Sequence, residues 1–315
     1  LFIDYNYENQ SKNYNHKSFL FIFIFLTIFN LLSIDLPLNK LDIFHEGQLL
    51  SGSFNFDDSK KLWMSSYSNT GIFYDVINTK IAWTISGIQS IGSMRIYNIF
   101  LNYFSQIILI FLIFNISKKF DFNYNQKIIF FVILSILSTY FLQNALINYR
   151  DILLLFYLIF TLNILSGSDK NYLNCFLLGL LSILSLLWSL DSGAYLNACL
   201  VPLIIIFLYK KKYSNFFTLL FGIILGWFIF YSVVPIFEFK AFLYNSISIY
   251  KEHEFLNGII HPQPFSGEKN SSRATKILMV ILINGIILIN IIFSKKNLIP
   301  NNTKLFLILF FILAF

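Results

Sequence analysis

The stretch KKKYSNFFTLLFGIILGWFIFYSVVPI, residues 210–236, decides the fold class. Its three lysines are followed by a run, 215–236, that contains no charged residue. A helix needs about 20 apolar residues to cross a bilayer, and this run provides them. Lysines beside a span are retained on the cytoplasmic side. The stretch therefore predicts a transmembrane helix that starts at the cytoplasmic face and ends at the opposite one.

Similar apolar runs recur along the 315-residue chain. The sequence is 57% hydrophobic and only 12% charged, with a mean hydropathy of +0.67, whereas soluble proteins carry about 25% charged residues. We predict an all-α integral membrane protein, a single polytopic domain over residues 1–315 with about nine transmembrane helices. We also expect the chain to be a fragment that lacks a C-terminal part, because it ends within an apolar run. The predicted spans are 18–34, 97–116, 128–147, 152–166, 172–190, 195–209, 215–236, 277–294 and 304–315.

Lysines and acidic residues separate between the two faces of this topology. The cytoplasmic segments are short and rich in lysine: the N-terminal tail, 117–127, 167–171, 210–214 and 295–303. The opposite face receives two long loops, 35–96 and 237–276, and the turns 148–151 and 191–194. It carries 12 of the 16 acidic residues. Exclusion of charge from spans explains why charges lie in loops, but not why acids avoid the inner loops. We therefore predict a site on the extracytoplasmic face, in a bacterial inner (plasma) membrane.

The segment LDIFHEGQLL, residues 41–50, places charge directly after the first span. Asp42, His45 and Glu46 stand at positions i, i+3 and i+4, which share one face of a helix. A carboxylate near an apolar boundary loses solvation, which raises its pKa and makes it a better base. These three residues are our catalytic candidates. The alternative is a helix cap with a surface salt bridge.

The rest of the first long loop predicts an amphipathic helix. Between residues 76 and 95, isoleucines recur at one helical face: Ile77, Ile81, Ile85, Ile88 and Ile91. This pattern is typical of a helix that lies in the membrane interface, and equally of one packed on the surface of a bundle.

Three further parts of the outer face are candidates for substrate binding. Asp75 precedes the predicted amphipathic helix, where it either binds substrate or caps the helix. Arg150 and Asp191 lie in the two outer turns at membrane depth, where ionisable groups are functional candidates by default; turn formation by the sequence DSG is the competing explanation for Asp191. A guanidinium can grip a phosphate bidentately. The second long loop adds His253, His261 and Arg273, and basic residues there would attract a lipid phosphate.

The chain has an acidic motif soon after the first span, in a long outer loop that also contains an amphipathic helix. Many spans with short connections follow. This arrangement resembles that of the GT-C glycosyltransferases. The matching residues are Asp42 and Glu46 in LDIFHEGQ, with Asp35 as a competitor. The resemblance implies transfer of a sugar, with inversion, from a polyprenyl-phosphate carrier to a glycan, lipid or protein acceptor. It also implies a first-loop carboxylate as base and Arg150 or a second-loop cation on the carrier phosphate.

The resemblance leaves the cofactor open. It allows a divalent metal, Mg²⁺ or Mn²⁺, shared by Asp42 and Glu46, while the residues themselves assign no metal ligand. The adjacent Asp-Glu or Asp-x-Asp pair usual in the family is absent, so the identity of the base stays open between Asp42 and Glu46.

Two other functions compete with this reading. An O-antigen polymerase or ligase would rely on arginine and histidine, so that His253, His261 and Arg273 would matter most. A transporter of lipid-linked glycans would place ionisable groups in the middle of spans, and these spans contain almost none. Nucleic-acid binding is not implied by the net charge of +7, because lysines beside spans account for it.

Overall fold

The computed structural model describes residues 16–32, 43–59, 70–120, 122–141, 149–166, 171–252, 263–267, 271–293 and 301–314. About 90% of this part of the chain is helical, and it contains no strand. The prediction of an all-α protein is therefore confirmed. The elements up to the middle of the chain are α1 (His16–Leu32), α2 (Ile43–Ser59), the π-helical turn η2 (Phe73–Ile77), α3 (Asn78–Ser86), α4 (Ile91–Lys119), α5 (Tyr124–Ile136), the π-helical turn η3 (Leu137–Phe141) and the 3-10 turn η4 (Tyr149–Asp151). They are followed by α6 (Ile152–Ser166), α7 (Tyr172–Trp188), α8 (Leu190–Tyr209), α9 (Tyr213–Val233), α10 (Ile236–Lys251), α12 (Ser271–Phe293) and α13 (Asn301–Ala314).

Four helices of the described residues are long and apolar enough to cross a membrane. They are Ile91–Lys119, Leu190–Tyr209, Tyr213–Val233 and Ala274–Phe293. Shorter apolar helices at Ser18–Leu32, Tyr124–Thr139 and Tyr172–Trp188 accompany them. This set supports an integral membrane protein, whereas a total of nine spans stays a prediction.

Helix α7 lies between α6, α8 and α9, and its closest approach is to α9. Glycines make that approach possible. A Cβ atom built on Gly179 of α7 would lie 2.3 Å from the carbonyl oxygen of Leu219, and one on Gly222 of α9 would lie 2.4 Å from that of Phe176. Helices in lipid gain little hydrophobic driving force from one another, so close backbone packing through small residues stabilises their contact.

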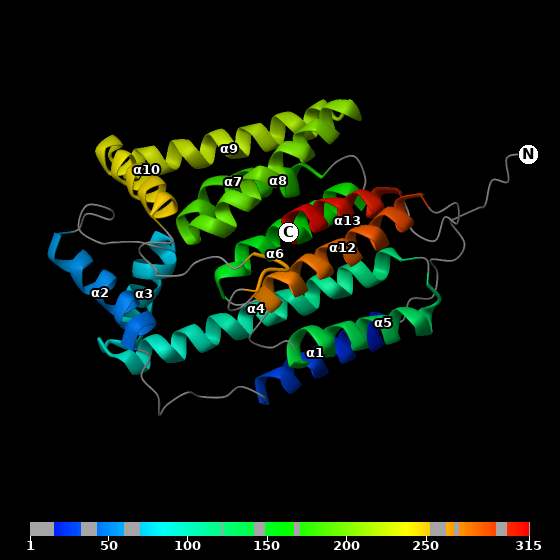
Figure 1. The fold of residues 1–315 in the computed structure, drawn as a ribbon, viewed down its shortest axis with the longest axis horizontal. Helices are drawn as coiled ribbons and strands as arrows, with labels where there is room; N and C mark the ends of the chain where they lie inside the picture. Colours follow the sequence, from blue (N-terminus) through cyan, green and yellow to red (C-terminus); the bar gives the residue numbers. More distant parts are fainter. Residues whose placement is uncertain are drawn as a thin grey trace, which may run out of the picture.

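The bundle has two chemically different ends (Figure 1). Lys118 and Lys119 close α4 at one end, where Lys210–Lys212 also join α8 to α9. The opposite end gathers η2, α2, α3, α10 and the joint between α7 and α8. Segments that were predicted to face the extracytoplasmic side thus meet at the end without the lysine turns.

The structure corrects three local predictions. The helix expected over 76–95 is interrupted at Gly87, whose φ of +67° is left-handed, and Ser90 then caps a new helix, α4. The turn expected at 191–194 is helical, because α8 begins at Leu190 and Ser189 alone separates it from α7. The long outer loops contain the helices α2 and α10, which were not predicted. By contrast, α6 has the predicted bounds of 152–166.

Candidate functional site

Three segments that are distant in sequence are tied together at the end of the bundle without the lysine turns. The backbone N–H of Leu190 donates to the carbonyl oxygen of Thr70 over 2.6 Å. The indole N–H of Trp188 donates to the carbonyl oxygen of Tyr149 over 3.0 Å. The ring of Tyr74 stacks on that of Tyr149, with centroids 5.0 Å apart. Residues 70–75, η4 and the α7–α8 joint therefore form one unit, which we call the outer-end cluster.

A close backbone contact brings this unit together. A Cβ atom on Gly71 would lie 2.6 Å from the carbonyl oxygen of Trp188 and 2.8 Å from the Cα atom of Ser189. Any larger residue would push the segment of residues 70–71 away from the α7–α8 joint. Glycine at this position is what allows the hydrogen bond between Thr70 and Leu190.

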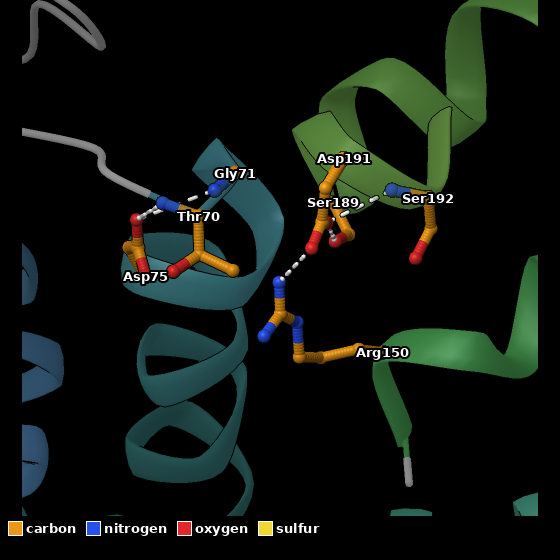
Figure 2. Close-up of polar contacts among 7 residues, drawn as sticks. All are labelled: Thr70, Gly71, Asp75, Arg150, Ser189, Asp191 and Ser192. Carbon is orange, nitrogen blue, oxygen red and sulfur yellow. Dashed lines mark hydrogen bonds and ion pairs between the residues drawn. The ribbon is translucent and has the colours of Figure 1, made fainter. Parts of the chain in front are cut away.

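Asp75 holds the turn at the start of the cluster. Its side chain is fully buried, and its Oδ2 atom accepts hydrogen bonds from the backbone N–H groups of Thr70, at 2.7 Å, and Gly71, at 3.3 Å (Figure 2). The carboxylate thus reaches back toward the N-terminus. The alternative that Asp75 caps the following helix is wrong, because a capping side chain binds N–H groups that follow it. These two hydrogen bonds are with the turn, and the predicted contact of Asp75 with substrate stays a prediction.

Arg150 and Asp191 form an ion pair within the cluster. The Nη2 atom of Arg150 lies 2.6 Å from Oδ2 of Asp191. Asp191 also accepts from the Ser189 hydroxyl and, over 2.8 Å, from the N–H of Ser192 (Figure 2). The guanidinium carbon lies 5.1 Å from the centre of the Tyr74 ring. Both charges are accessible, since the side chains are 29% and 56% exposed.

The position of Asp191 has a local cause. It lies in the first turn of α8, where a negative charge is favoured by the helix dipole. Its side chain and that of Arg150 meet although the residues come from separate parts of the chain. The structure therefore brings Asp75, Arg150 and Asp191, each predicted separately, to one end of the bundle (Figure 2).

Tyr149 contributes a neutral group to the cluster. Burial is the main cause that raises the pKa of its phenol far above the ordinary value, and the neighbouring Tyr74 and Asp75 add to it. Its hydroxyl therefore stays protonated at any physiological pH. The backbone N–H of Tyr149 is bound by the Oδ1 atom of Asn102 over 2.9 Å, which links η4 to α4.

Glu46 lies in α2 and is bound by a residue that the sequence analysis missed. The Nε and Nη2 atoms of Arg95, in the second turn of α4, lie 2.5 and 2.8 Å from its two carboxylate oxygens. The two side chains are only 12% and 17% exposed. The amino-acid composition could have indicated Arg95 as a candidate, because only three of the 23 basic residues are arginines. In a chain that otherwise uses lysine, an arginine is a candidate for bidentate binding of a carboxylate, as Arg95 shows.

Several predicted site residues lie outside the part of the chain that the structure describes. These are Asp42, His253 and His261, together with the competitor Asp35. His45 and Arg273 belong to the helices α2 and α12, but their side chains are likewise outside the description. Their roles stay predictions.

An open apolar groove of about 610 Å³ lies at the elbow between α3 and α4. The indole N–H of Trp83 closes this elbow by donating to the carbonyl oxygen of Ser90 over 3.1 Å. Most of the groove is hydrocarbon. The larger residues that line it are Ile85, Ile88, Ile96, Tyr97 and Phe100.

Among the described residues, no three His, Cys, Asp or Glu side chains are grouped so that they could hold a metal ion. Of the pair that the resemblance suggested as metal ligands, Glu46 has both carboxylate oxygens engaged by Arg95. A metal at Glu46 would have to displace that guanidinium, and Asp42 lies outside the described residues. Comparison of the chain with models of known protein families, with curated proteins and with solved structures gave no match.

Proposed function

We propose that this protein is a membrane glycosyltransferase of the GT-C type, which transfers a sugar from a polyprenyl-phosphate carrier to an acceptor at the extracytoplasmic face. One observation carries the proposal: Arg150, Asp191 and Asp75 lie together at one end of an apolar bundle, and the lysine turns lie at its other end. A lipid-linked anionic substrate needs both an apolar path for its tail and a cation where the tail meets water. In this proposal the outer-end cluster supplies the cation, and the groove between α3 and α4 supplies the apolar surface.

Arg150 is the residue that we assign to the carrier phosphate. Its ion pair with Asp191 is accessible to solvent, and such pairs contribute only about 0–1 kcal/mol to stability. A phosphate can therefore replace the carboxylate at small cost, and its bidentate bonds to a guanidinium are stronger than those of a neutral acceptor. As the leaving phosphate gains charge, the same guanidinium stabilises it.

The base of the proposed reaction is a first-loop carboxylate. Both oxygens of Glu46 are engaged by Arg95, so we assign the base to Asp42, which comes directly before α2. Glu46 then acts as a positioning residue that fixes the start of α2 on α4. The base removes the proton of the acceptor hydroxyl while its oxygen attacks the anomeric carbon. The bond to the carrier phosphate breaks on the opposite side, which inverts the configuration.

The groove between α3 and α4 gives the prenyl tail a place in this proposal. It is apolar, and Ile85, Ile88 and Ile96 on its walls are more than half exposed. Ser90 and Ser93 are also among the residues that line it. An isoprenoid chain that occupies it would remove these surfaces from contact with the bilayer.

The test is sugar transfer from a radiolabelled polyprenyl-phosphate-sugar pool in membranes that contain the full-length protein. We expect Asp42→Asn to lower the rate by about 10²–10⁴-fold, the usual contribution of a general base. Arg150→Gln should raise the concentration of carrier required as well as slow transfer. Lys210→Gln, at the opposite end, is the matched control and should transfer at the wild-type rate.

Other results would point elsewhere. If Asp42→Asn and Glu46→Gln keep activity while His253→Ala abolishes it, the O-antigen polymerase or ligase reading replaces ours. Wild-type membranes that transfer no sugar from any polyprenyl-phosphate donor would contradict the proposed glycosyltransferase.

A further inference from the structure

Helix α10 presents an exposed apolar stripe that the bundle does not cover. It begins at Ile236, directly after Pro235, which breaks the continuity with α9. Its outward residues recur at helical spacing along one side. They are Ile236 (68% exposed), Phe237 (52%), Leu243 (43%), Tyr244 (73%) and Ile247 (54%), with Lys240 and Lys251 also exposed on this helix.

The opposite side of α10 is fixed to the bundle. Phe242 is buried with Ile72 and Val76 of the η2 region and with Phe230 and Val234 of the α9 end. Phe239 packs on Trp227 and Tyr231, at centroid distances of 5.8 and 5.2 Å. The helix is therefore a firmly attached element with one covered and one uncovered side.

The charged residues of α10 also differ between its covered and its uncovered side. Glu238 is buried, whereas Lys240 and Lys251 are exposed. Glu252, also exposed, follows the last residue of the helix. The uncovered side within α10 is thus apolar with positive charge alone, which is the composition of helices that lie in an interface with anionic lipids.

The length of α9 indicates the depth of α10 in the membrane. The 21 residues of α9 span about 31 Å at 1.5 Å per residue, which matches the hydrocarbon core of about 30 Å. Since α9 begins after the lysine turn, its other end reaches the opposite interface. Figure 1 shows that α10 turns away from the axis of α9 at this point and lies across the end of the bundle.

We propose that the uncovered side of α10 binds the headgroup layer of the membrane. Ile236, Phe237 and Tyr244 enter the boundary with the acyl chains, and Lys240 and Lys251 lie beside anionic lipid phosphates. Because Phe242 on the other side packs with Ile72 and Val76, this contact also supports the turn that carries Asp75. The inference does not rest on the proposed sugar transfer.

Nitroxide labels on single cysteines test it in vesicles of phosphatidylcholine with and without phosphatidylglycerol. The full chain with Cys175→Ala and Cys199→Ala, both buried positions, is the background. Labels go on Phe237→Cys, Tyr244→Cys and Ile247→Cys. Phe228→Cys, 69% exposed on α9, is the hydrocarbon reference, and Lys210→Cys is the aqueous reference.

We expect the ratio of oxygen to nickel-chelate accessibility at the α10 sites to exceed that at Lys210→Cys and to fall below that at Phe228→Cys. Added phosphatidylglycerol should raise the ratio further, and the Lys240→Gln, Lys251→Gln double variant should lose that response. Ratios equal to the aqueous reference would overturn the proposal. So would strongly immobilised labels with low accessibility to both reagents, because a protein surface would then cover the stripe. A stripe that inserts but shows no response to phosphatidylglycerol in the unsubstituted background would overturn the assignment of the lysines.

Discussion

The ion pair between Glu46 and Arg95 separates two roles that a carboxylate can have. Both Glu46 oxygens are engaged by one guanidinium, at 2.5 and 2.8 Å, and neither side chain is more than 17% exposed. Removing one member of such a pair leaves the other charge in a poorly solvated place. A purely structural Glu46 therefore affects folding, whereas a base affects the rate.

We expect Glu46→Gln to lower the midpoint of thermal unfolding in detergent, and Arg95→Met to do the same. The double variant should be more stable than the sum of the two single effects predicts, because it leaves neither charge alone. Circular dichroism at matched concentration measures this. A Glu46→Gln protein of unchanged stability that transfers no sugar would show instead that Glu46 is the base.

A second prediction at the scale of residues concerns the effect of Gly71→Ala on stability. A Cβ atom there would lie 2.6 Å from the Trp188 carbonyl oxygen, whereas one on Gly47 meets nothing within 4 Å. Gly71→Ala should therefore destabilise the protein by about 1–3 kcal/mol, the usual range for overpacking. Gly47→Ala is the control and should lack that contribution. Equal unfolding midpoints for the two variants would contradict the close approach of residues 70–71 to the α7–α8 joint.

At the scale of elements, the structure shows which helices sequence reasoning can find. The helices α6 and α9 were predicted because apolar runs alone determine them. Helices α2 and α10 were missed, since polar and charged residues interrupt their apolar ones and both pack against distant segments. The break at Gly87 was also missed: the isoleucine pattern passes through it, but a left-handed residue ends the helix.

The contact between α7 and α9 yields an element-scale prediction. Gly179→Ala or Gly222→Ala would place a Cβ atom 2.3 or 2.4 Å from a facing carbonyl oxygen. Each should force the helices apart and cost about 1–3 kcal/mol. Gly285→Ala on α12, where the nearest atom would be at an ordinary 3.5 Å, is the matched control. Unfolding by dodecyl sulfate compares them, and three identical curves would show that α7 and α9 are not in close backbone contact.

At the scale of the whole molecule, the distribution of charge predicts how the bundle is oriented in the membrane. Lysine turns lie at one end and the outer-end cluster at the other (Figure 1). The sequence predicted Arg150 and Asp191 as separate candidates, because each stands where an apolar run ends. It did not predict that they pair, since 41 residues separate them and only the packing of α6, α7 and α8 brings them together.

The orientation itself is a prediction. In the background without cysteines, a membrane-impermeant maleimide added to intact cells should label Gln89→Cys, in the exposed elbow between α3 and α4. Lys210→Cys should react only after the cells are permeabilised. The reverse pattern would place the outer-end cluster in the cytoplasm and would contradict the proposed extracytoplasmic reaction.

The hydrogen bond between Thr70 and Leu190 also sets an order in time during synthesis. Leu190 leaves the ribosome about 120 residues after Thr70, a delay of about 6–24 s at about 5–20 residues per second. Until then Gly71 cannot pack against Trp188 and Ser189, because these residues have not yet been synthesised. A nascent chain stalled before α8 emerges should therefore leave residues 70–75 open to proteases and dependent on the insertion machinery. The outer-end cluster is thus completed late, by the insertion of α8.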